Sequence, residues 1–426
     1  MNEIQVHKDE IPATIEELKD FILIGTERLK AYRARLNAVK KLSLAKNIVE
    51  QALEDAQNVA TALLFAESRL GGLISNIEKE PGKRNDLLPS TNRGTSLQDI
   101  GIGYKEQHFA QLLHENQNTM KGVINFSKQN GTIPTKYEVL KRVKEIERQN
   151  VIHKYRRAAM DEAASAIPDN SSPISDFLDK VFMSDIREVL KNLPDKSVDM
   201  IFTDADYNLP GTNYAGRRFT SDFSDYMKWY ILLAQELFRV LKDDGNMFFI
   251  NYARQNALLW GKYLDDVCYD VQEYVWCYNT DTGRHNKHFT KAHRSILHAT
   301  KSENNRWYNY EVLEPYTHVD NVGVKRRMEA GFGNGRAPYS WFNLGTCNNI
   351  PNETKIHPCV LPEAIVDKFI RASTVAGNVI LIPFGGAGTE ILASKRLDRH
   401  FISAEIVDVY HGLIMQRLRD FDASQD

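Results

Sequence analysis

The sequence of 426 residues predicts an α/β domain with a mostly parallel sheet, preceded by an α-helical domain. In the second part of the chain, short apolar runs alternate with stretches of helical periodicity, which is typical of a parallel sheet covered on both faces. In the first part, apolar residues recur at intervals of three and four without such runs. Residues 166–177, rich in Pro, Ser and Asp, separate the two parts and predict a linker.

Composition and charge restrict the classes of function. The chain is 42% hydrophobic and 26% charged, as in an ordinary soluble globular protein, and its net charge of −2 gives no overall field toward nucleic acid or a membrane. The amino terminus is charged, and no apolar run reaches the roughly 18 residues of a membrane span. Four scattered cysteines without metal-ligand spacing predict reduced thiols and no metal site. We therefore expect a cytoplasmic protein that would bind a polyanion only through local patches of basic residues.

The helical domain is expected over residues 1–165. Within it, residues 95–113 have the sequence T-S-L-Q-D-I-G-I-G-Y-K-E-Q-H-F-A-Q-L-L, which predicts a short helix, a Gly turn and a second helix. This spacing is compatible with a helix-turn-helix whose second helix presents Lys105, Gln107 and His108 to a DNA groove. An ordinary corner between two helices explains the same spacing, so both interpretations stay open.

Strand and helix candidates follow one another in the second domain, expected over residues 178–426. The apolar runs that predict strands are 181–185, 198–204, 246–251, 275–278, 295–300, 378–383 and 400–405. The stretches that predict helices are 223–241, 256–268, 362–374 and 390–396. In a sheet of this kind, ligands bind at the carboxyl ends of the parallel strands.

Two of these strand ends carry unusual residues. The run V-D-M-I-F-T leads to Asp204 and continues A-D-Y, so that a buried strand delivers a carboxylate to the sheet edge. The strand at 378–383 continues as F-G-G-A-G-T-E, a Gly-rich turn that lets the backbone approach a ligand closely before a helix. About twenty positions later, Glu405 ends the next strand, where an acid can accept hydrogen bonds from ribose hydroxyls. These features favour a nucleotide-like ligand.

In order and spacing, these motifs resemble those of the β-class amino DNA methyltransferases, which methylate adenine N6 or cytosine N4. That family places a catalytic motif, [DNS]-P-P-[YFW], before a cofactor motif, D-P-F-x-G-x-G-T, and D-A-D-Y and I-P-F-G-G-A-G-T stand in that order here. H-P-C-V-L-P (357–362) is similar to the family's H-P-T-Q-K-P element. The resemblance covers about residues 178–420. It implies a Rossmann-like, S-adenosylmethionine-dependent methyltransferase fold with permuted motif order.

The resemblance also implies roles for individual residues. The Asp204 side chain and the Ala205 carbonyl would accept the two hydrogens of an exocyclic amine, and Tyr207 would stack on the flipped target base. Phe384 would pack near the Gly turn, and Glu405 would hold the ribose of S-adenosyl-L-methionine. The residues expected at the cofactor are Pro383, Phe384, Gly385, Gly386, Gly388, Thr389, Glu405 and His357, and those expected at the catalytic centre are Asp204, Ala205, Asp206 and Tyr207.

Several motif positions depart from the family pattern. Ala205 and Asp206 replace the two prolines that stiffen the catalytic loop. Ile382 stands where the cofactor motif has Asp, and Val-Leu at 360–361 stands where the family has Gln-Lys. Asp206 also places a second carboxylate beside Asp204, and two close carboxylates tend to raise one pKa. These departures keep open a second class of function, a methyltransferase-fold DNA-binding or regulatory protein without turnover.

Between the two motifs, at about 281–356, the alternation of strands and helices fades. This stretch combines basic and aromatic residues, as in R-H-N-K-H-F-T-K-A-H-R and N-N-R-W-Y-N-Y, which suits phosphate contact and base stacking. In the family that the chain resembles, target recognition can lie here; a solvent-exposed insertion is the plainer interpretation. The expected DNA contacts are Arg284, Lys287, Lys291, Arg326 and Arg327, with Lys105 and His108 of the helical domain. His285, His288 and His293 lack nearby Cys or carboxylate ligands, so they predict no metal site.

The interpretation that combines these features is a site-specific DNA methyltransferase. We expect it to move a methyl group from S-adenosyl-L-methionine to an exocyclic amine of double-stranded DNA, at adenine N6 in preference to cytosine N4. The expected role is in restriction-modification. We expect the protein to act alone, as a homodimer or with a partner subunit of a modification system, and not at a membrane. An RNA or small-molecule methyltransferase is a third hypothesis, which the basic and aromatic insertion and the helix-turn-helix candidate disfavour.

Overall fold

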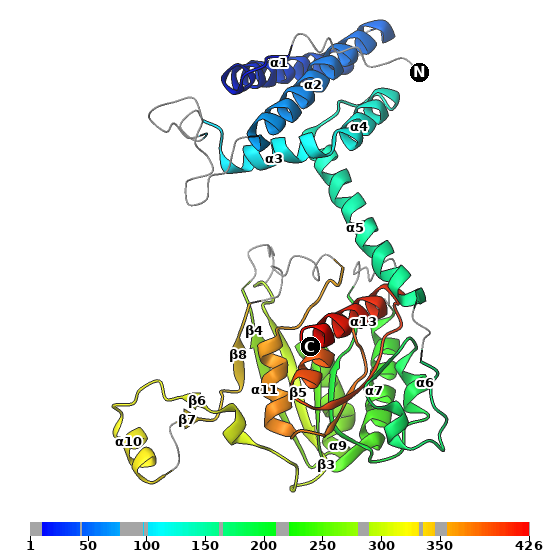
Figure 1. Cartoon of the computed structure of the whole chain (residues 1–426), viewed down its shortest axis with the longest axis vertical. Helices are drawn as coiled ribbons and strands as arrows, with labels where there is room; N and C mark the ends of the chain where they lie inside the picture. The colour runs from blue at the N-terminus through cyan, green and yellow to red at the C-terminus, as the bar shows by residue number, and fades with distance from the viewer. Residues whose placement is uncertain are drawn as a thin grey trace. The chain divides into compact units, whose positions relative to one another are not determined.

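The computed structural model of the chain contains two compact units, Met1–Gln149 and Asn150–Asp426 (Figure 1). The structure describes residues 11–42, 45–76, 97, 101–161, 165–209, 221–279, 289–331, 335–345 and 356–425. The division between the units falls within helix α5 (Lys136–Asp161), before the expected end of the helical domain at residue 165. The last turns of α5 belong to the second unit, because Ile152 packs in a cluster with Tyr410 and Arg156 pairs with Asp408 at 2.9 Å.

The first unit is all-helical in the residues that the structure describes, as the spacing of its apolar residues predicts. Its helices are α1 (Ile15–Lys41), α2 (Lys46–Ser75), α3 (Tyr104–Glu115), α4 (Gln117–Gln129) and the first part of α5. Leu18 of α1 and Leu70 of α2 share one buried cluster. Gly71 of α2 lies against α3, where an added Cβ would be 1.9 Å from the carbonyl oxygen of Ala110. Although α1 and α2 are long, no helix in the described residues is long and apolar enough to cross a membrane.

The expected helix-turn-helix is described only in part, since residues 98–100 lie outside the described residues. Its second helix is α3, which begins after Gly101, a residue with a φ of +81°. Lys105 and His108 lie on α3, and both are exposed. DNA binding by this helix stays a prediction.

The second unit is built on a mostly parallel sheet, as expected. Its strands are β1 (Lys180–Phe182), β2 (Val198–Asp204), β3 (Leu241–Asn251), β4 (Asp270–Cys277), β5 (His293–Thr300), β8 (Trp341–Asn343), β9 (Val379–Ile382) and β10 (His400–Ala404). In the described residues their order is β1-β10-β9-β2-β3-β5-β4-β8. Neighbours run parallel except where β5 pairs with β3 and with β4. The strand candidates of the sequence are confirmed, and β8 is a strand that the sequence did not predict.

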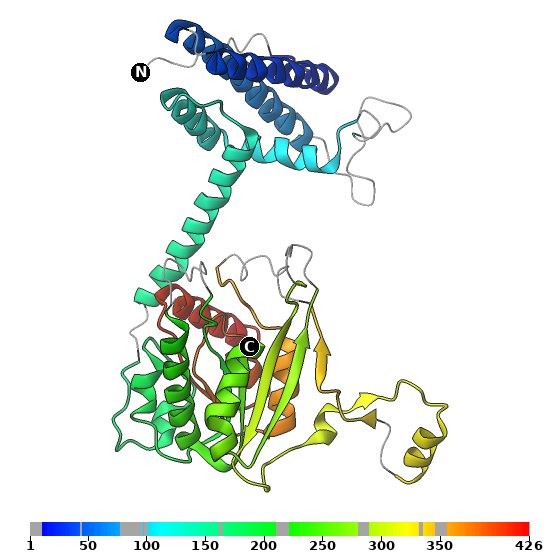
Figure 2. The ribbon, with the colours of Figure 1, turned by 180° about the vertical axis from the view of Figure 1, so that it is seen from behind.

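Helices cover both faces of this sheet. One face carries α6 (Ile186–Leu190), α7 (Phe223–Val240), α8 (Ala253–Leu259), a π-helical turn (Trp260–Leu264) and α9 (Asp265–Val267); the other carries α11 (Glu363–Ser373), α12 (Thr389–Arg396) and α13 (Asp408–Ala423). Figure 1 shows α11 and α13 in front of the sheet, and Figure 2 shows the opposite side. Ile201 packs on the first face, whereas Met200 and Phe202 pack on the second. This alternation follows from the two-residue period of a strand.

The topology brings four strand ends to one edge. β1, β10, β9 and β2 are neighbours and parallel, so their carboxyl ends lie together. Asp185 follows β1, Glu405 follows β10, the Gly-rich turn follows β9, and Asp204 ends β2. This is the edge at which parallel sheets bind ligands.

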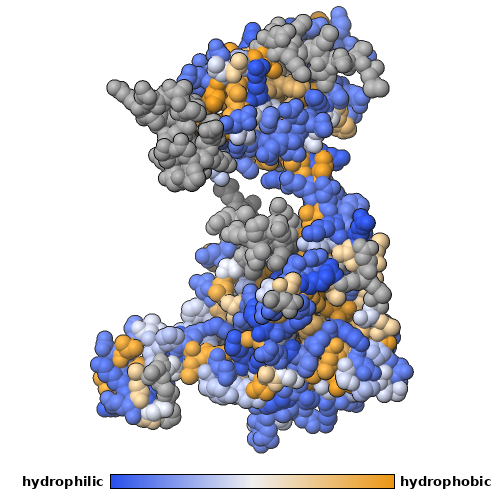
Figure 3. Space-filling model, viewed as in Figure 1, coloured by the Kyte–Doolittle hydropathy of each residue, from blue (hydrophilic) through white to orange (hydrophobic). Residues whose placement is uncertain are grey.

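Part of the predicted insertion forms a small excursion from the sheet (Figures 1 and 2). It contains a 3-10 turn (Asn309–Val312), α10 (Val322–Glu329), and the paired strands β6 (Glu314–Pro315) and β7 (Gly335–Arg336). No residue of α10 is buried: Arg326 and Arg327 are exposed, and so are the apolar Val322 and Met328 (Figure 3). Basic and apolar side chains therefore face solvent together in this segment.

Candidate active site

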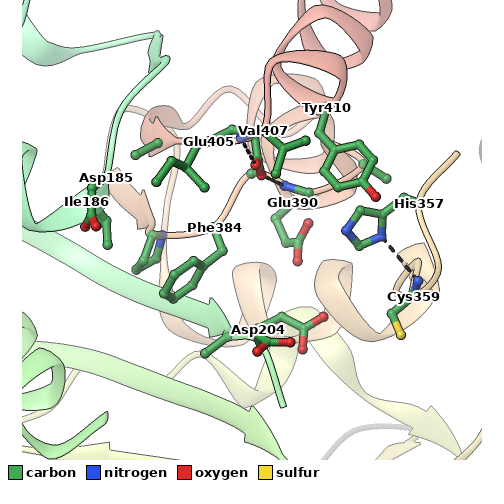
Figure 4. Close-up of a pocket in the computed structure, with 18 of the residues that line it drawn as sticks. Asp185, Ile186, Asp204, His357, Cys359, Phe384, Glu390, Glu405, Val407 and Tyr410 are labelled. Atoms are coloured by element: carbon green, nitrogen blue, oxygen red, sulfur yellow. Dashed lines mark hydrogen bonds between the residues drawn. The ribbon is translucent and has the colours of Figure 1, made fainter. Parts of the chain in front are cut away.

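A cavity of about 280 Å³ opens at the carboxyl edge of β1, β10, β9 and β2 (Figure 4). Ligand sites commonly enclose roughly 300–1,000 Å³, so the cavity is close to the size that holds a small molecule. Of the residues expected at the site, its lining contains Asp204, Ala205, Asp206, Tyr207, His357, Pro383, Phe384, Gly385, Gly386, Thr389 and Glu405, whereas Gly388 is not part of the lining. The structure thus gathers both expected motifs around one space. It also adds Asp185, Tyr226 and Glu390, which were not among the expected site residues.

Asp204 is the last residue of β2 and lies at the wall of the cavity (Figure 4). Its Oδ1 accepts a hydrogen bond from the Tyr207 hydroxyl. Removal from water raises the pKa of the Asp204 carboxyl to about 7, although the Tyr207 hydrogen bond and the Arg294 charge both act to lower it. The carboxyl therefore titrates near neutral pH, where a group that accepts a proton works best.

Tyr207 has a positioning role in addition to the expected stacking on a base. Its side chain is buried, and its hydroxyl donates to Asp204. The Arg294 guanidinium lies 5.0 Å from the centre of its ring, and the Tyr252 ring meets it edge-on at 5.5 Å. These contacts fix the ring, and the ring in turn orients the Asp204 carboxyl.

The backbone of the D-A-D-Y loop is held by side chains from neighbouring elements. The Tyr226 hydroxyl of α7 donates to the carbonyl of Asp206 at 2.8 Å, and Asn251 of β3 donates to that hydroxyl at 2.8 Å. Gln255 of α8 donates to the carbonyl of Tyr207 at 3.1 Å. Buried hydrogen bonds of this kind are costly to break, since a lost partner leaves a desolvated polar group. They restrain the loop that prolines stiffen in the resembled family.

Asp206, the second acid of the motif, is engaged in the turn that follows. Its Oδ2 accepts a hydrogen bond from the backbone N–H of Asn208 at 3.2 Å. Asn208 has a φ of +55°, a left-handed conformation that Asn tolerates better than most residues. Its side-chain amide donates to the carbonyl of Ser221 and accepts from the N–H of the same residue. Asp206 therefore shapes the loop, and its charge makes a minor contribution to the raised pKa of Asp204.

The Gly-rich turn after β9 is tied to the end of β10 by Glu405. One carboxylate oxygen of Glu405 accepts from the N–H of Gly386 at 2.8 Å, and the other accepts from the N–H of Val407 at 2.8 Å. Gly386 and Gly388 have φ values of +54° and +82°, which only glycine adopts without strain. Each carboxylate oxygen can accept a further hydrogen bond, so Glu405 can hold the turn and a ligand hydroxyl together.

His357 lies across the cavity from this turn (Figure 4). Its Nδ1 accepts from the N–H of Cys359 at 3.3 Å, and burial lowers the pKa of the ring to about 4. The imidazole is therefore neutral at pH 7, with its proton on Nε2. A Cβ added at Gly386 would lie 3.3 Å from that nitrogen, so the glycine keeps open the space between the turn and the ring.

The lining is rich in acids. It contains Asp185, Asp204, Asp206, Glu390 and Glu405, while its basic side chains are Arg187 and the neutral His357. Arg187 is paired with Asp185 at 2.6 Å. The cavity thus favours a positively charged ligand. Of the departures from the family pattern, Val360 and Leu361 line the cavity, whereas Ile382 is buried in the core.

Arg294 of β5 ends the basic and aromatic stretch R-H-N-K-H-F-T-K-A-H-R, but it was not among the expected site residues. Its guanidinium donates to the Tyr278 hydroxyl and lies 4.0 Å from the ring centre of Tyr252 and 5.0 Å from that of Tyr207. Tyr207, Tyr252 and Tyr278 follow three different strands, so no local sequence pattern predicts that their rings meet at Arg294. Glu390 did have a local signal, because an acid in the first turn of a helix after a Gly-rich turn points toward the same edge.

The expected DNA contacts that the structure describes lie on separate elements. Lys291 is exposed, and its Nζ lies 5.9 Å from the Tyr252 ring centre, beside the aromatic cluster that packs on Tyr207. Arg326 and Arg327 lie on α10, and Lys105 and His108 belong to the first unit. Arg284 and Lys287 lie outside the described residues, as do His285 and His288. DNA contact by these residues stays a prediction.

The fold and the site define a class of protein. At the carboxyl edge of the sheet, Glu405 is bonded to the Gly-rich turn, and Asp204 ends the strand β2. This arrangement is suited to bind a nucleotide-like, positively charged molecule beside the carboxyl of Asp204. Such an arrangement supports group transfer from the bound molecule to a substrate that enters on the side of Asp204.

Related proteins identify the family. A family model described as DNA methylase, of the N6/N4 type, matches residues 198–416, and the chain belongs to this family. The chain is 26% identical over 257 residues to the Type II methyltransferase M.BglII of Bacillus subtilis, covering 57% of this chain and 69% of that protein. It is 25% identical over 246 residues to the DNA adenine methyltransferase YhdJ of Escherichia coli (strain K12), covering 56% and 82%. Among solved structures, the cytosine-N4-specific PvuII DNA methyltransferase aligns with a TM-score of 0.42 and 16% identity, covering 54% of this chain and 82% of that chain.

As a member of this family, the chain has S-adenosyl-L-methionine as its cofactor, as predicted. The residues of the cavity fit that molecule. The excess of acids suits its positive charge, and Glu405 presents acceptors for ribose hydroxyls at the tip of the Gly-rich turn. The space that a side chain at position 386 would fill stays open between the turn and His357.

Proposed function

We propose that the chain methylates an exocyclic amine of double-stranded DNA at specific sites, with adenine N6 as the target. One observation carries the proposal: Asp204, whose carboxyl has a pKa of about 7, shares a single cavity with the Gly-rich turn and Glu405. A carboxyl beside the methyl donor can accept a hydrogen bond from the amine that attacks the methyl group. The same cavity therefore provides for both reactants.

At the cofactor end, the residues of this chain bind and orient. Glu405 accepts from the ribose hydroxyls while its bonds to Gly386 and Val407 keep the turn close to the ligand. Phe384 packs against the core cluster that includes α7 and gives the turn an apolar support. When bound, S-adenosyl-L-methionine supplies an electrophilic methyl group on a positively charged sulfur.

At the amine end, Asp204 accepts one N–H of the target base and the carbonyl of Ala205 accepts the other. Both bonds would favour a tetrahedral nitrogen and direct its lone pair at the methyl group that bound S-adenosyl-L-methionine would supply, with the electron pair of the broken bond left on the departing thioether. The methylated nitrogen then carries one proton too many. Asp204, which titrates near neutral pH, takes that proton and releases it to solvent.

The base must leave the duplex to reach Asp204, at a cost of a few kcal/mol. Tyr207 offsets part of this cost where its ring lines the cavity. Lys291 and the exposed arginines of α10 would contact phosphates, so binding should weaken as salt is raised. Adenine as the target is supported by the likeness to a DNA adenine methyltransferase, and a role in restriction-modification is supported by the likeness to a Type II methyltransferase.

The alternative is a methyltransferase-fold protein that binds DNA without turnover. It depended on the departures from the family motifs at positions 205, 206, 360, 361 and 382, of which the loss of both prolines from the catalytic motif is the most serious. The hydrogen bonds from Tyr226 and Gln255 restrain the same loop, and Asp206 supports the following turn. These contacts favour the catalytic function.

Sequencing of DNA from cells that express the chain and lack other DNA methyltransferases tests this proposal. N6-methyladenine within a short recurring sequence is the expected result and would also give the recognition site. N4-methylcytosine in its place would correct the target base. DNA without any modified base would contradict the proposal.

Tyr226→Phe is expected to lower methyl transfer about tenfold, because the carbonyl of Asp206 and the amide of Asn251 each lose a buried partner worth roughly 1 kcal/mol. The matched control is Tyr230→Phe in the same helix, whose hydroxyl contacts Asn256 at 3.3 Å and also hydrogen-bonds Asn251. The two variants therefore share the contact with Asn251 and differ in the bond to the carbonyl of Asp206. Initial rates of transfer to DNA measure both variants. Equal rates in the two variants would show that the hydroxyl of Tyr226 does not restrain the loop.

A further inference from the structure

Glu390 is a buried acid that the proposed methyl transfer does not use. It lies in the first turn of α12, directly after the Gly-rich turn, and only 6% of its surface is exposed. Its carboxyl points into the cavity, toward the space that Asp204 and His357 also border (Figure 4). The family's cofactor motif, D-P-F-x-G-x-G-T, ends at Thr389 and assigns no role to Glu390.

Glu390 differs from the other acids of the cavity in its hydrogen bonding. Those acids have protein donors: Arg187 for Asp185, Tyr207 for Asp204, the N–H of Asn208 for Asp206, and the N–H groups of Gly386 and Val407 for Glu405. Among the described residues, the backbone N–H of Glu390 itself hydrogen-bonds the carboxyl, and no other residue donates to it. The basic side chain whose charge acts on it, Arg417, donates to the carbonyl of Ala387.

This environment disfavours the carboxylate until a donor arrives. Burial raises the pKa of the Glu390 carboxyl to about 8, and the nearby charge of Asp204 contributes in the same direction. A cation with N–H groups would reverse the effect, because an opposite charge and a hydrogen bond both favour the ionised form. Charge-assisted hydrogen bonds between such groups are roughly twice as strong as neutral ones.

We propose that Glu390 binds the α-ammonium group at the methionyl end of S-adenosyl-L-methionine. The assignment rests on the proposed function, which places that molecule in the cavity. Its ribose has Glu405 as a partner, and its sulfur has no N–H to donate. The ammonium is the part of the molecule that offers both a positive charge and N–H donors, which is what a buried carboxyl without a side-chain donor requires.

Calorimetric titration with two ligands tests the proposal without any need for turnover. S-adenosyl-L-homocysteine carries the ammonium and an uncharged sulfur, whereas 5′-methylthioadenosine lacks the whole methionyl end. Glu390→Gln is expected to weaken binding of the first ligand at least about tenfold and that of the second less than about twofold. The matched control is Glu363→Gln, which changes an exposed acid in the first turn of α11, outside the cavity, and should leave both affinities as in the wild type.

The outcomes separate the two proposals. Unchanged binding of S-adenosyl-L-homocysteine to Glu390→Gln overturns the assignment, and so does an equal loss for both ligands, which would indicate a general change in the cavity. Loss of methyl transfer with unchanged ligand binding also overturns it, because Glu390 would then act on the target base. Absence of binding to the wild-type chain would instead contradict the proposed function itself.

Discussion

Asp204→Ala is expected to reduce methyl transfer to DNA by roughly 10²–10⁴-fold, the range that a positioned proton acceptor usually contributes. Alanine has no oxygen that could accept from the amine and no group that could take the proton that leaves. Binding of S-adenosyl-L-homocysteine should change less than about threefold, since Asp204 is placed at the amine end. Single-turnover rates and calorimetry measure the two quantities.

Asp206→Asn is the comparison for this variant, since Asp206 lies two residues after Asp204 in the same motif. An asparagine at 206 keeps an oxygen for the N–H of Asn208, so the turn after the motif should survive. We expect this variant to lose less than about tenfold in transfer, because the role of Asp206 is a single hydrogen bond to the backbone. A larger loss for Asp206→Asn than for Asp204→Ala would reverse the roles assigned to the two acids.

The pH dependence follows from the same carboxyl. Only ionised Asp204 accepts an N–H, so transfer by the wild type should rise with pH through about 7 and level off above it. Tyr207→Phe removes a hydrogen bond that lowers the pKa of Asp204, so the rise should move to higher pH. An unchanged midpoint in this variant would show that the titrating group lies elsewhere.

Stability gives an independent check on Asp204. Because burial raises its pKa above that of the unfolded chain, the folded state loses stability as pH rises from about 4 toward 7. Asp204→Asn should therefore unfold at a higher temperature than the wild type at pH 8, and the difference should vanish near pH 4. A lower unfolding temperature at pH 8 would mean that the variant disturbs the fold.

Glu405→Ala is expected to weaken binding of S-adenosyl-L-homocysteine at least about 100-fold, the second large effect. The substitution removes the acceptors for the ribose and also leaves the N–H groups of Gly386 and Val407 without partners, at a cost of roughly 1–3 kcal/mol each. Glu405→Gln keeps one acceptor oxygen and should fall between the alanine variant and the wild type. Wild-type affinity in Glu405→Ala would remove Glu405 from the cofactor site.

The sequence predicted those parts of the site that depend on local order. Asp204 and Glu405 follow apolar runs, and the Gly-rich turn lies between a strand and a helix, so each could be placed at a strand end. Parallel strands bring their carboxyl ends to the same edge, which explains why two distant motifs meet in one cavity. The helices α6 and α13 were not predicted, although both carry buried residues of the core.

Other parts of the site depend on contacts that no local pattern contains. Tyr226 and Gln255 reach the D-A-D-Y loop from α7 and α8, and Arg294 reaches Tyr207 from β5. Their positions follow from the order of strands in the sheet and from helix packing. The hydrogen bonds that restrain the loop where the family has two prolines therefore could not be predicted from the sequence.

The central claim is that the carboxyl edge of this sheet transfers methyl groups to an amine of DNA. The most direct measurement incubates the wild-type chain with unmethylated double-stranded DNA and S-adenosyl-L-methionine labelled in its methyl group, and then identifies the labelled nucleoside after digestion. We expect labelled N6-methyladenine from the wild type and essentially none from Asp204→Ala. A wild-type chain that binds the cofactor but leaves the DNA unlabelled, or equal labelling by both proteins, would contradict the account.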